Sequence, residues 1–122
     1  MPVIAQVFAG IAAALHVAIF GMESLWWSRP QVWRRFGLTS QADADVARPL
    51  AFNQGFYNLF LAIGIVVGLV VGGVAGHAIV VFCCVSIVGA ALVLASTGSK
   101  YLRPAVLQGI TPLLALITAA IF

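Results

Sequence analysis

Four apolar runs, each about as long as a membrane is thick, constrain this chain more than any other feature. They cover residues 3–25, 49–73, 75–97 and 104–122, and about 20 apolar residues suffice for a helix to cross the hydrocarbon core of a bilayer. Of the 122 residues, 63% are hydrophobic and 7% are charged, which excludes a soluble surface. The sequence therefore predicts an all-α integral membrane protein, a four-transmembrane-helix bundle with short loops.

The lengths of these runs leave no room for a separate soluble domain. We therefore expect residues 1–122 to form a single four-helix membrane domain, in which 26–48 is the one long loop. Pro49 favours the start of the second span, because proline is well tolerated in the first turn of a helix. The pair Gly72-Gly73 predicts its end. Before that span, the stretch from Thr39 to Asp43 is typical of a capping signal for a short helix leading into it.

The basic residues predict how the chain is oriented. Four crossings place loops 26–48 and 98–103 on one side of the membrane and both termini on the other. Every Lys and Arg of the chain lies in these two loops: Arg29, Arg34, Arg35, Arg48, Lys100 and Arg103. The positive-inside rule makes this side cytoplasmic. We expect a multi-pass protein of the plasma (inner) membrane with both termini outside.

Loop 26–48 mixes aromatic and basic residues, which predicts that it lies along the membrane surface. Trp26, Trp27 and Trp33 suit the headgroup region, while the arginines face anionic lipid. Membrane lipids are thus expected partners, and docking of another protein on this loop is the alternative. Nucleic acid is not an expected partner, because the basic residues flank hydrophobic spans.

Gly64, Gly68 and Gly72 recur at four-residue spacing, which puts them on one face of the second span. Small-residue faces let another helix approach closely in lipid. The motif predicts close packing within the bundle or, as the alternative, homodimerisation through this face.

Two ionisable residues lie within the first span, where a charge is costly. His16 is near the middle of the span and Glu23 is near its cytoplasmic end. Their seven-residue separation returns to nearly the same face of an α-helix, about 10 Å along its axis. We therefore expect both side chains to line one cavity.

The other spans carry their polar side chains at a similar depth. Together these predict a polar pocket open to the cytoplasm, with a ligand-binding set of His16, Glu23, Asn53, Gln54, Tyr57, Asn58 and Gln108. The alternatives are structural. Glu23 would extend to the interface and pair with an arginine, and the amides would hydrogen-bond neighbouring helices.

Three stretches of the sequence resemble a known family. They are His16 to Trp26, with Glu23 inside it, Asn53-Gln-Gly-Phe-Tyr-Asn58 with the residues up to Gly64, and Gln108 to Pro112. This pattern resembles small bacterial and fungal four-span membrane proteins catalogued as a domain of unknown function. The family more often has Ala after the last proline, where this chain has Leu113. The resemblance implies a four-span fold and the same polar positions, but no activity.

Three functions fit these features. The first is binding or transport of a small amphiphilic or lipophilic ligand, with Glu23 exchanging a proton. The second is a membrane-embedded enzyme, of the isomerase or hydrolase kind, that uses His16 and Glu23 as the catalytic acid and base on a lipophilic substrate. The third is a structural or accessory subunit. No cofactor and no metal is expected, because no phosphate loop, nucleophile elbow or metal-ligand spacing is present.

Overall fold

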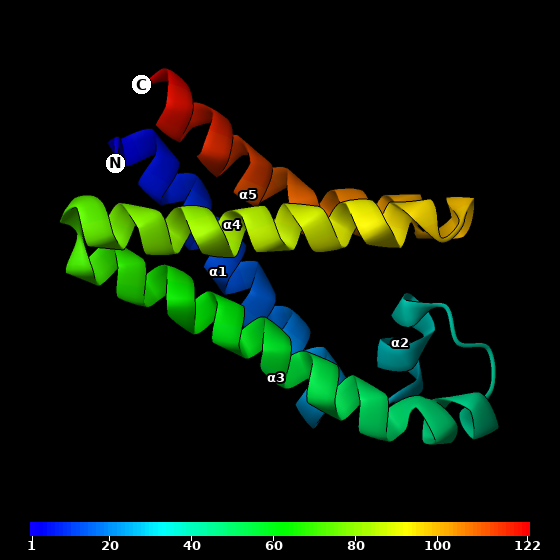
Figure 1. Cartoon of the computed structure of the whole chain (residues 1–122). Helices are drawn as coiled ribbons and strands as arrows, with labels where there is room; N and C mark the ends of the chain where they lie inside the picture. Colours follow the sequence, from blue (N-terminus) through cyan, green and yellow to red (C-terminus); the bar gives the residue numbers. More distant parts are fainter. The chain divides into compact units, whose positions relative to one another are not determined.

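The computed structural model describes all 122 residues, and every regular element in it is helical (Figure 1). In chain order the elements are α1 (Val3–Phe20), the π-helical turn η1 (Gly21–Leu25), α2 (Pro30–Trp33), the 3-10 turn η2 (Arg34–Phe36), α3 (Gln41–Val71), α4 (Gly73–Ser96), the 3-10 turn η3 (Ser99–Tyr101) and α5 (Leu102–Ile121).

The predicted all-α class with four long apolar helices is confirmed. Four segments are long and apolar enough to cross a membrane: Val3–Leu25, Gln41–Val71, Gly73–Ser96 and Ser99–Ile121. The chain is accordingly a multi-pass membrane protein.

The second long helix begins at Gln41 rather than at Pro49, so the expected short leading helix and the span are one element. Ser40 caps this helix, because its Oγ accepts a hydrogen bond from the backbone N–H of Asp43 at 3.1 Å. Pro49 lies inside α3. Ala44 and Ala51, one before and one after the proline, are both buried, so α3 is packed against the protein on both sides of Pro49.

The chain divides into two compact units, which we describe in turn. The first comprises Met1–Leu15 and Leu61–Phe122. It contains the first part of α1, the end of α3, and α4 packed along α5 (Figure 1). Its core consists of small and β-branched side chains from all four helices, among them Ala9, Ile65, Ile87 and Ala115. Small residues let helices approach closely in a medium where hydrophobicity gives no net attraction between them.

The glycine face of α3 packs against α4 within this first unit. A Cβ on Gly64 would meet the Sγ of Cys83 at 2.7 Å, and a Cβ on Gly68 would meet the Val80 side chain at 2.7 Å. These two positions therefore serve the close packing that the motif predicted. Homodimerisation through the same face is not tested by these contacts and stays a prediction.

Gly72 and Gly73 make the turn between α3 and α4, as the sequence predicts. Their φ angles are 64° and 62°, in a region that residues with a Cβ rarely adopt. A cavity of about 130 Å³ lies beside this turn and is lined in part by Gln6 and His77. It contains no acidic side chain.

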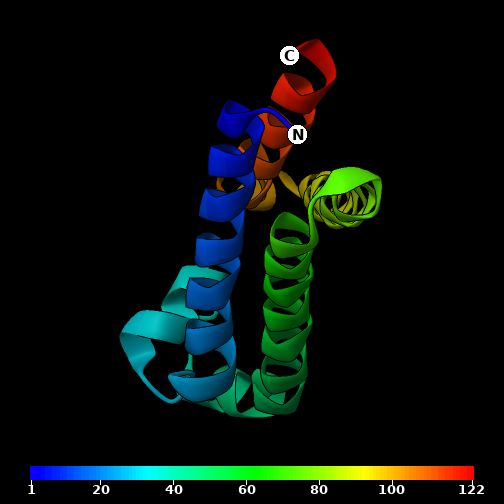
Figure 2. The ribbon, with the colours of Figure 1, turned by 90° about the vertical axis from the view of Figure 1, so that its left-hand side faces the viewer.

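The second unit is His16–Phe60. It contains the end of α1, η1, α2, η2 and the first part of α3, and Figure 2 shows the end of α1 running beside α3. Its core is formed by Trp27, Trp33, Ala44 and Ala51. Two of the three tryptophans expected among lipid headgroups are therefore buried in protein, whereas Trp26 is exposed.

Candidate functional site

Glu23 is the centre of the candidate site, because it is a buried carboxyl group in an apolar part of the chain. It lies on η1 and is 7% exposed. The side-chain N–H of Asn58, on α3, donates to Glu23 Oε1 with an Nδ2–Oε1 distance of 2.6 Å. Asn58 is also buried. A buried polar group needs such a partner, and this hydrogen bond ties the first span to the second.

The π-helical turn determines where Glu23 points. A π turn closes i→i+5 hydrogen bonds, here from the Trp26 N–H to the Gly21 carbonyl at 2.9 Å, and such turns are frequent at functional sites. A second bond, from the Ser24 hydroxyl to the Phe52 carbonyl at 2.8 Å, joins this turn to α3. Two hydrogen bonds therefore hold this irregular turn in place.

Gly55 makes the close approach between η1 and α3 possible. A Cβ at this position would overlap the Ser24 side chain and lie 3.1 Å from the Cβ of Glu23. Phe56, the residue after Gly55, packs edge-on against Phe20, with ring centroids 5.1 Å apart. The glycine of the Asn-Gln-Gly stretch is therefore a packing residue that sets the position of Glu23.

An open pocket of about 380 Å³ includes Glu23 and lies wholly within the second unit. This volume is within the range of about 300–1,000 Å³ that is usual for small-molecule sites. Its lining residues are Glu23, Trp27, Phe36, Leu38, Ala47, Leu50, Ala51, Asn53 and Gln54. Glu23, Trp27 and Ala51 are its buried members, while Leu50, Asn53 and Gln54 are exposed.

The apolar wall of the pocket is held by two contacts. Trp27 and Phe36 have ring centroids 5.3 Å apart, and the indole N–H of Trp27 donates to the Ala44 carbonyl at 2.9 Å. Trp27 is therefore fixed to α3, and Phe36 packs against Trp27. A carboxyl group, two amides and an aromatic wall together suit a ligand with one polar end and an apolar body.

The alternative in which Glu23 pairs with an arginine is not what the structure shows. Glu23 forms no ion pair, and its one side-chain hydrogen bond is to Asn58. Arg29, Arg34 and Arg48 are all exposed. The carboxyl group is thus buried without a cationic partner.

The structure brings together four of the seven predicted site residues. Glu23, Asn53 and Gln54 line the pocket, and Asn58 bonds to the carboxyl group. Tyr57 does not line it and is 59% exposed. Tyr57 lies on the same side of α3 as the lining residue Asn53 but one turn further along the helix, beyond Gln54, which is the last residue of α3 that lines the pocket.

His16 and Gln108 are not among the lining residues of this pocket. His16 is fully buried on α1. The expectation that it shares a cavity with Glu23 assumed α-helical spacing, which does not hold through the π turn. Gln108 lies on α5 in the first unit and is half-buried.

Sequence reasoning missed the wall of the pocket. Trp27, Phe36 and Leu38 come from the long loop, which the sequence predicted as a surface anchor. The alternation of aromatic residues with arginines signalled an interface, and nothing in it distinguished a lipid interface from an internal one. No group of three or more His, Cys, Asp or Glu side chains is placed to hold a metal ion.

Four membrane-spanning helices and a pocket with a buried carboxyl group at the end of the first span define the class: an all-helical, multi-span membrane protein. The family model described as "Protein of unknown function (DUF1304)" matches residues 10–120, and the chain belongs to this family. The predicted family resemblance is thereby confirmed. The searches of curated proteins and of solved structures found no match.

Proposed function

We propose that this protein binds a small amphiphilic ligand whose basic head group pairs with Glu23 and whose apolar body lies against Trp27 and Phe36. The observation that carries this proposal is a carboxyl group that is buried, held by Asn58 and included in an open pocket. The proposed function needs only reversible binding of the ligand and no covalent step.

The physical reason is the cost of burying a carboxylate. A buried carboxylate is unfavourable unless a proton or a cation neutralises it, and no arginine of this chain pairs with Glu23. A ligand ammonium group supplies the missing charge. Its binding would release the proton that Glu23 otherwise carries, which is the exchange that proton-coupled transport requires.

We further propose that the pocket faces the cytoplasm. Trp27, Phe36 and Leu38 belong to the stretch 26–48, which also carries four of the six basic residues. Because basic loops are retained on the cytoplasmic side, the pocket would open towards that side of the plasma membrane.

The test is thermal stabilisation of the purified protein, in a non-ionic detergent, by alkylammonium ions of increasing chain length. Alkyl sulfates of the same lengths serve as the anionic comparison. We expect the cations to stabilise the wild type, and more strongly at higher pH, since protons compete with the cation for Glu23. Glu23→Gln should weaken binding about tenfold or more, which corresponds to about 1.4 kcal/mol.

Asp43→Asn is the matched control, because it removes the same charge from an exposed position in the first turn of α3. It should leave the stabilisation unchanged. Equal stabilisation of the wild type and Glu23→Gln by every cation, or equal stabilisation by cations and sulfates, would exclude the proposed site.

A further inference from the structure

The segment of residues 26–37, which we term the arginine segment, has two different sides. Trp27 and Phe36 line the pocket and are packed against each other. Arg29, Arg34 and Arg35 of the same segment are all exposed. The segment therefore carries three positive charges on its solvent side and contains no acidic residue.

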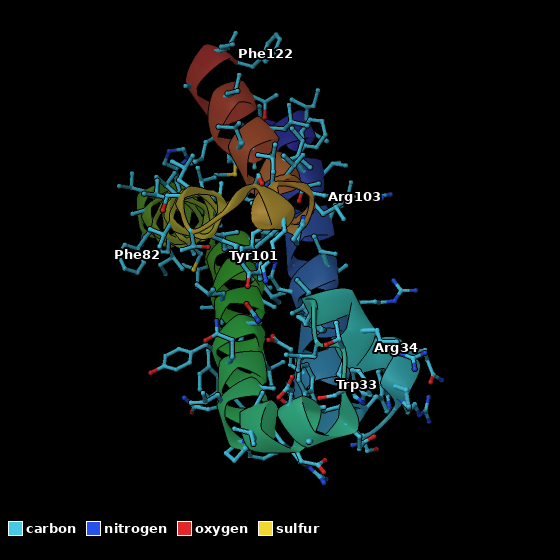
Figure 3. All side chains as sticks on the ribbon, turned by 90° about the vertical axis from the view of Figure 1, so that its right-hand side faces the viewer. Trp33, Arg34, Phe82, Tyr101, Arg103 and Phe122 are labelled. Atoms are coloured by element: carbon cyan, nitrogen blue, oxygen red, sulfur yellow. The ribbon has the colours of Figure 1, made fainter.

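The guanidinium groups of this segment are not used within the protein. None of the three makes an ion pair or a hydrogen bond to another residue. The Arg34 guanidinium group makes a cation–π contact with the Trp33 ring, 5.4 Å from the ring centroid. Figure 3 shows Arg34 at the outer edge of the segment, beside Trp33. Trp33 is buried, whereas Arg34 is exposed, so this contact leaves the Arg34 guanidinium group accessible.

The segment directly follows a membrane span. Leu25 ends that span and is 59% exposed, and Trp26 is 44% exposed. An exposed tryptophan at the end of a span is typical of the headgroup region. The three arginines follow within nine positions of Trp26, so they lie near the level where lipid phosphates are found.

We propose that the arginine segment is a binding surface for anionic lipid headgroups, in which Arg34 and Arg35 hold the phosphate. Guanidinium groups bind phosphate oxygens through two parallel hydrogen bonds, which an ammonium group cannot reproduce. None of the three arginines lines the Glu23 pocket, so this proposal does not depend on the proposed ligand. Its partner is the lipid of the surrounding bilayer.

The test compares phosphatidylglycerol with phosphatidylcholine, added to the whole protein in non-ionic detergent. Lipid retention is measured by native mass spectrometry and stability by the midpoint of thermal unfolding. We expect phosphatidylglycerol to be retained in greater number and to raise the midpoint more than phosphatidylcholine does. In the double variant Arg34→Gln/Arg35→Gln, this difference between the two lipids should fall by at least half.

The control double variant, Lys100→Gln/Arg103→Gln, removes the same charge from exposed positions outside the segment. It should keep the preference for phosphatidylglycerol. Arg34→Lys/Arg35→Lys retains the charge and should lose only part of the preference. Equal retention of both lipids by the wild type would overturn the proposal. So would an equal loss of preference in both glutamine variants, because only net charge would then matter.

Discussion

The pairing of Glu23 with Asn58 is the feature on which the candidate site depends at the scale of single residues. Both side chains are buried, and the 2.6 Å hydrogen bond between them is the contact that satisfies the carboxyl group within the protein. A hydrogen bond contributes little net stability while it is made, yet a buried group left without its partner is costly. Removing the amide should therefore be felt in stability as well as in ligand binding.

Asn58→Ala should lower the free energy of unfolding by about 1–3 kcal/mol, because it leaves the buried Glu23 carboxyl group without a donor. The measurement is reversible unfolding in mixed detergent micelles. Asn53→Ala is the matched control: it removes the same amide from an exposed position and should change the free energy of unfolding by less than about 0.5 kcal/mol. Equal losses in the two variants would contradict the role given to Asn58.

The contact of η1 with α3 positions the site at the scale of elements. The π turn is joined to α3 by the Ser24 hydroxyl, and Gly55 supplies the space into which Ser24 fits. A side chain at position 55 would push the two elements apart. Glu23 is the neighbour of Ser24, so it would move with the turn.

Gly55→Ala should destabilise the protein by about 1–3 kcal/mol through overpacking, and should weaken ligand binding at Glu23. Gly10→Ala is the control, since Gly10 is also helical but has open space around its would-be Cβ. Alanine there should stabilise by up to about 1 kcal/mol, as expected from helix propensity. The double variant Gly55→Ala/Ser24→Gly removes the overlapping side chain and should recover part of the loss. A Gly55→Ala variant as stable as the wild type, or a double variant that recovers none of the loss, would refute the packing argument.

The whole molecule is organised by the separation of charge along the chain. All six basic residues lie in two stretches, 29–48 and 100–103, and three of them, Arg48, Lys100 and Arg103, lie in the first turns of long apolar helical segments. An even number of crossings and the positive-inside rule then predict a single orientation. This orientation decides from which side the Glu23 pocket is reached.

Single cysteines introduced on a Cys83→Ala/Cys84→Ala background test the orientation. Val74 is 90% exposed and lies at the start of α4, next to the turn from α3. A cysteine at this position should react with a membrane-impermeant maleimide added outside intact cells. Cysteines at the exposed positions Ser28 and Ser99 should react only after the cells have been permeabilised. Labelling of Val74→Cys and Ser28→Cys from the same side would contradict the predicted topology.

Much of the fold followed from the sequence, and less of the site did. The four long helices, the Gly72-Gly73 turn and the close packing at Gly64 and Gly68 were all predictable, because each depends on local composition or spacing. Of the site, Glu23, with the neighbouring amides, was predictable from the cost of burying polar groups in a membrane. The positions of Tyr57 and His16 relative to the pocket were not, because they depend on where the pocket ends along α3 and on the irregular turn after α1.

The sequence by itself determined that the chain crosses a membrane with four helices and that all its basic residues lie in two short stretches, 29–48 and 100–103. Hydrophobic length and charge distribution are properties of the linear chain, so neither needs a tertiary contact. Only the tertiary structure decided that Asn58 is the partner of Glu23 and that Trp27 and Phe36 form the wall of its pocket. The physical reason is that these pairings depend on close packing at Gly55 and on a π turn, and local propensity specifies neither.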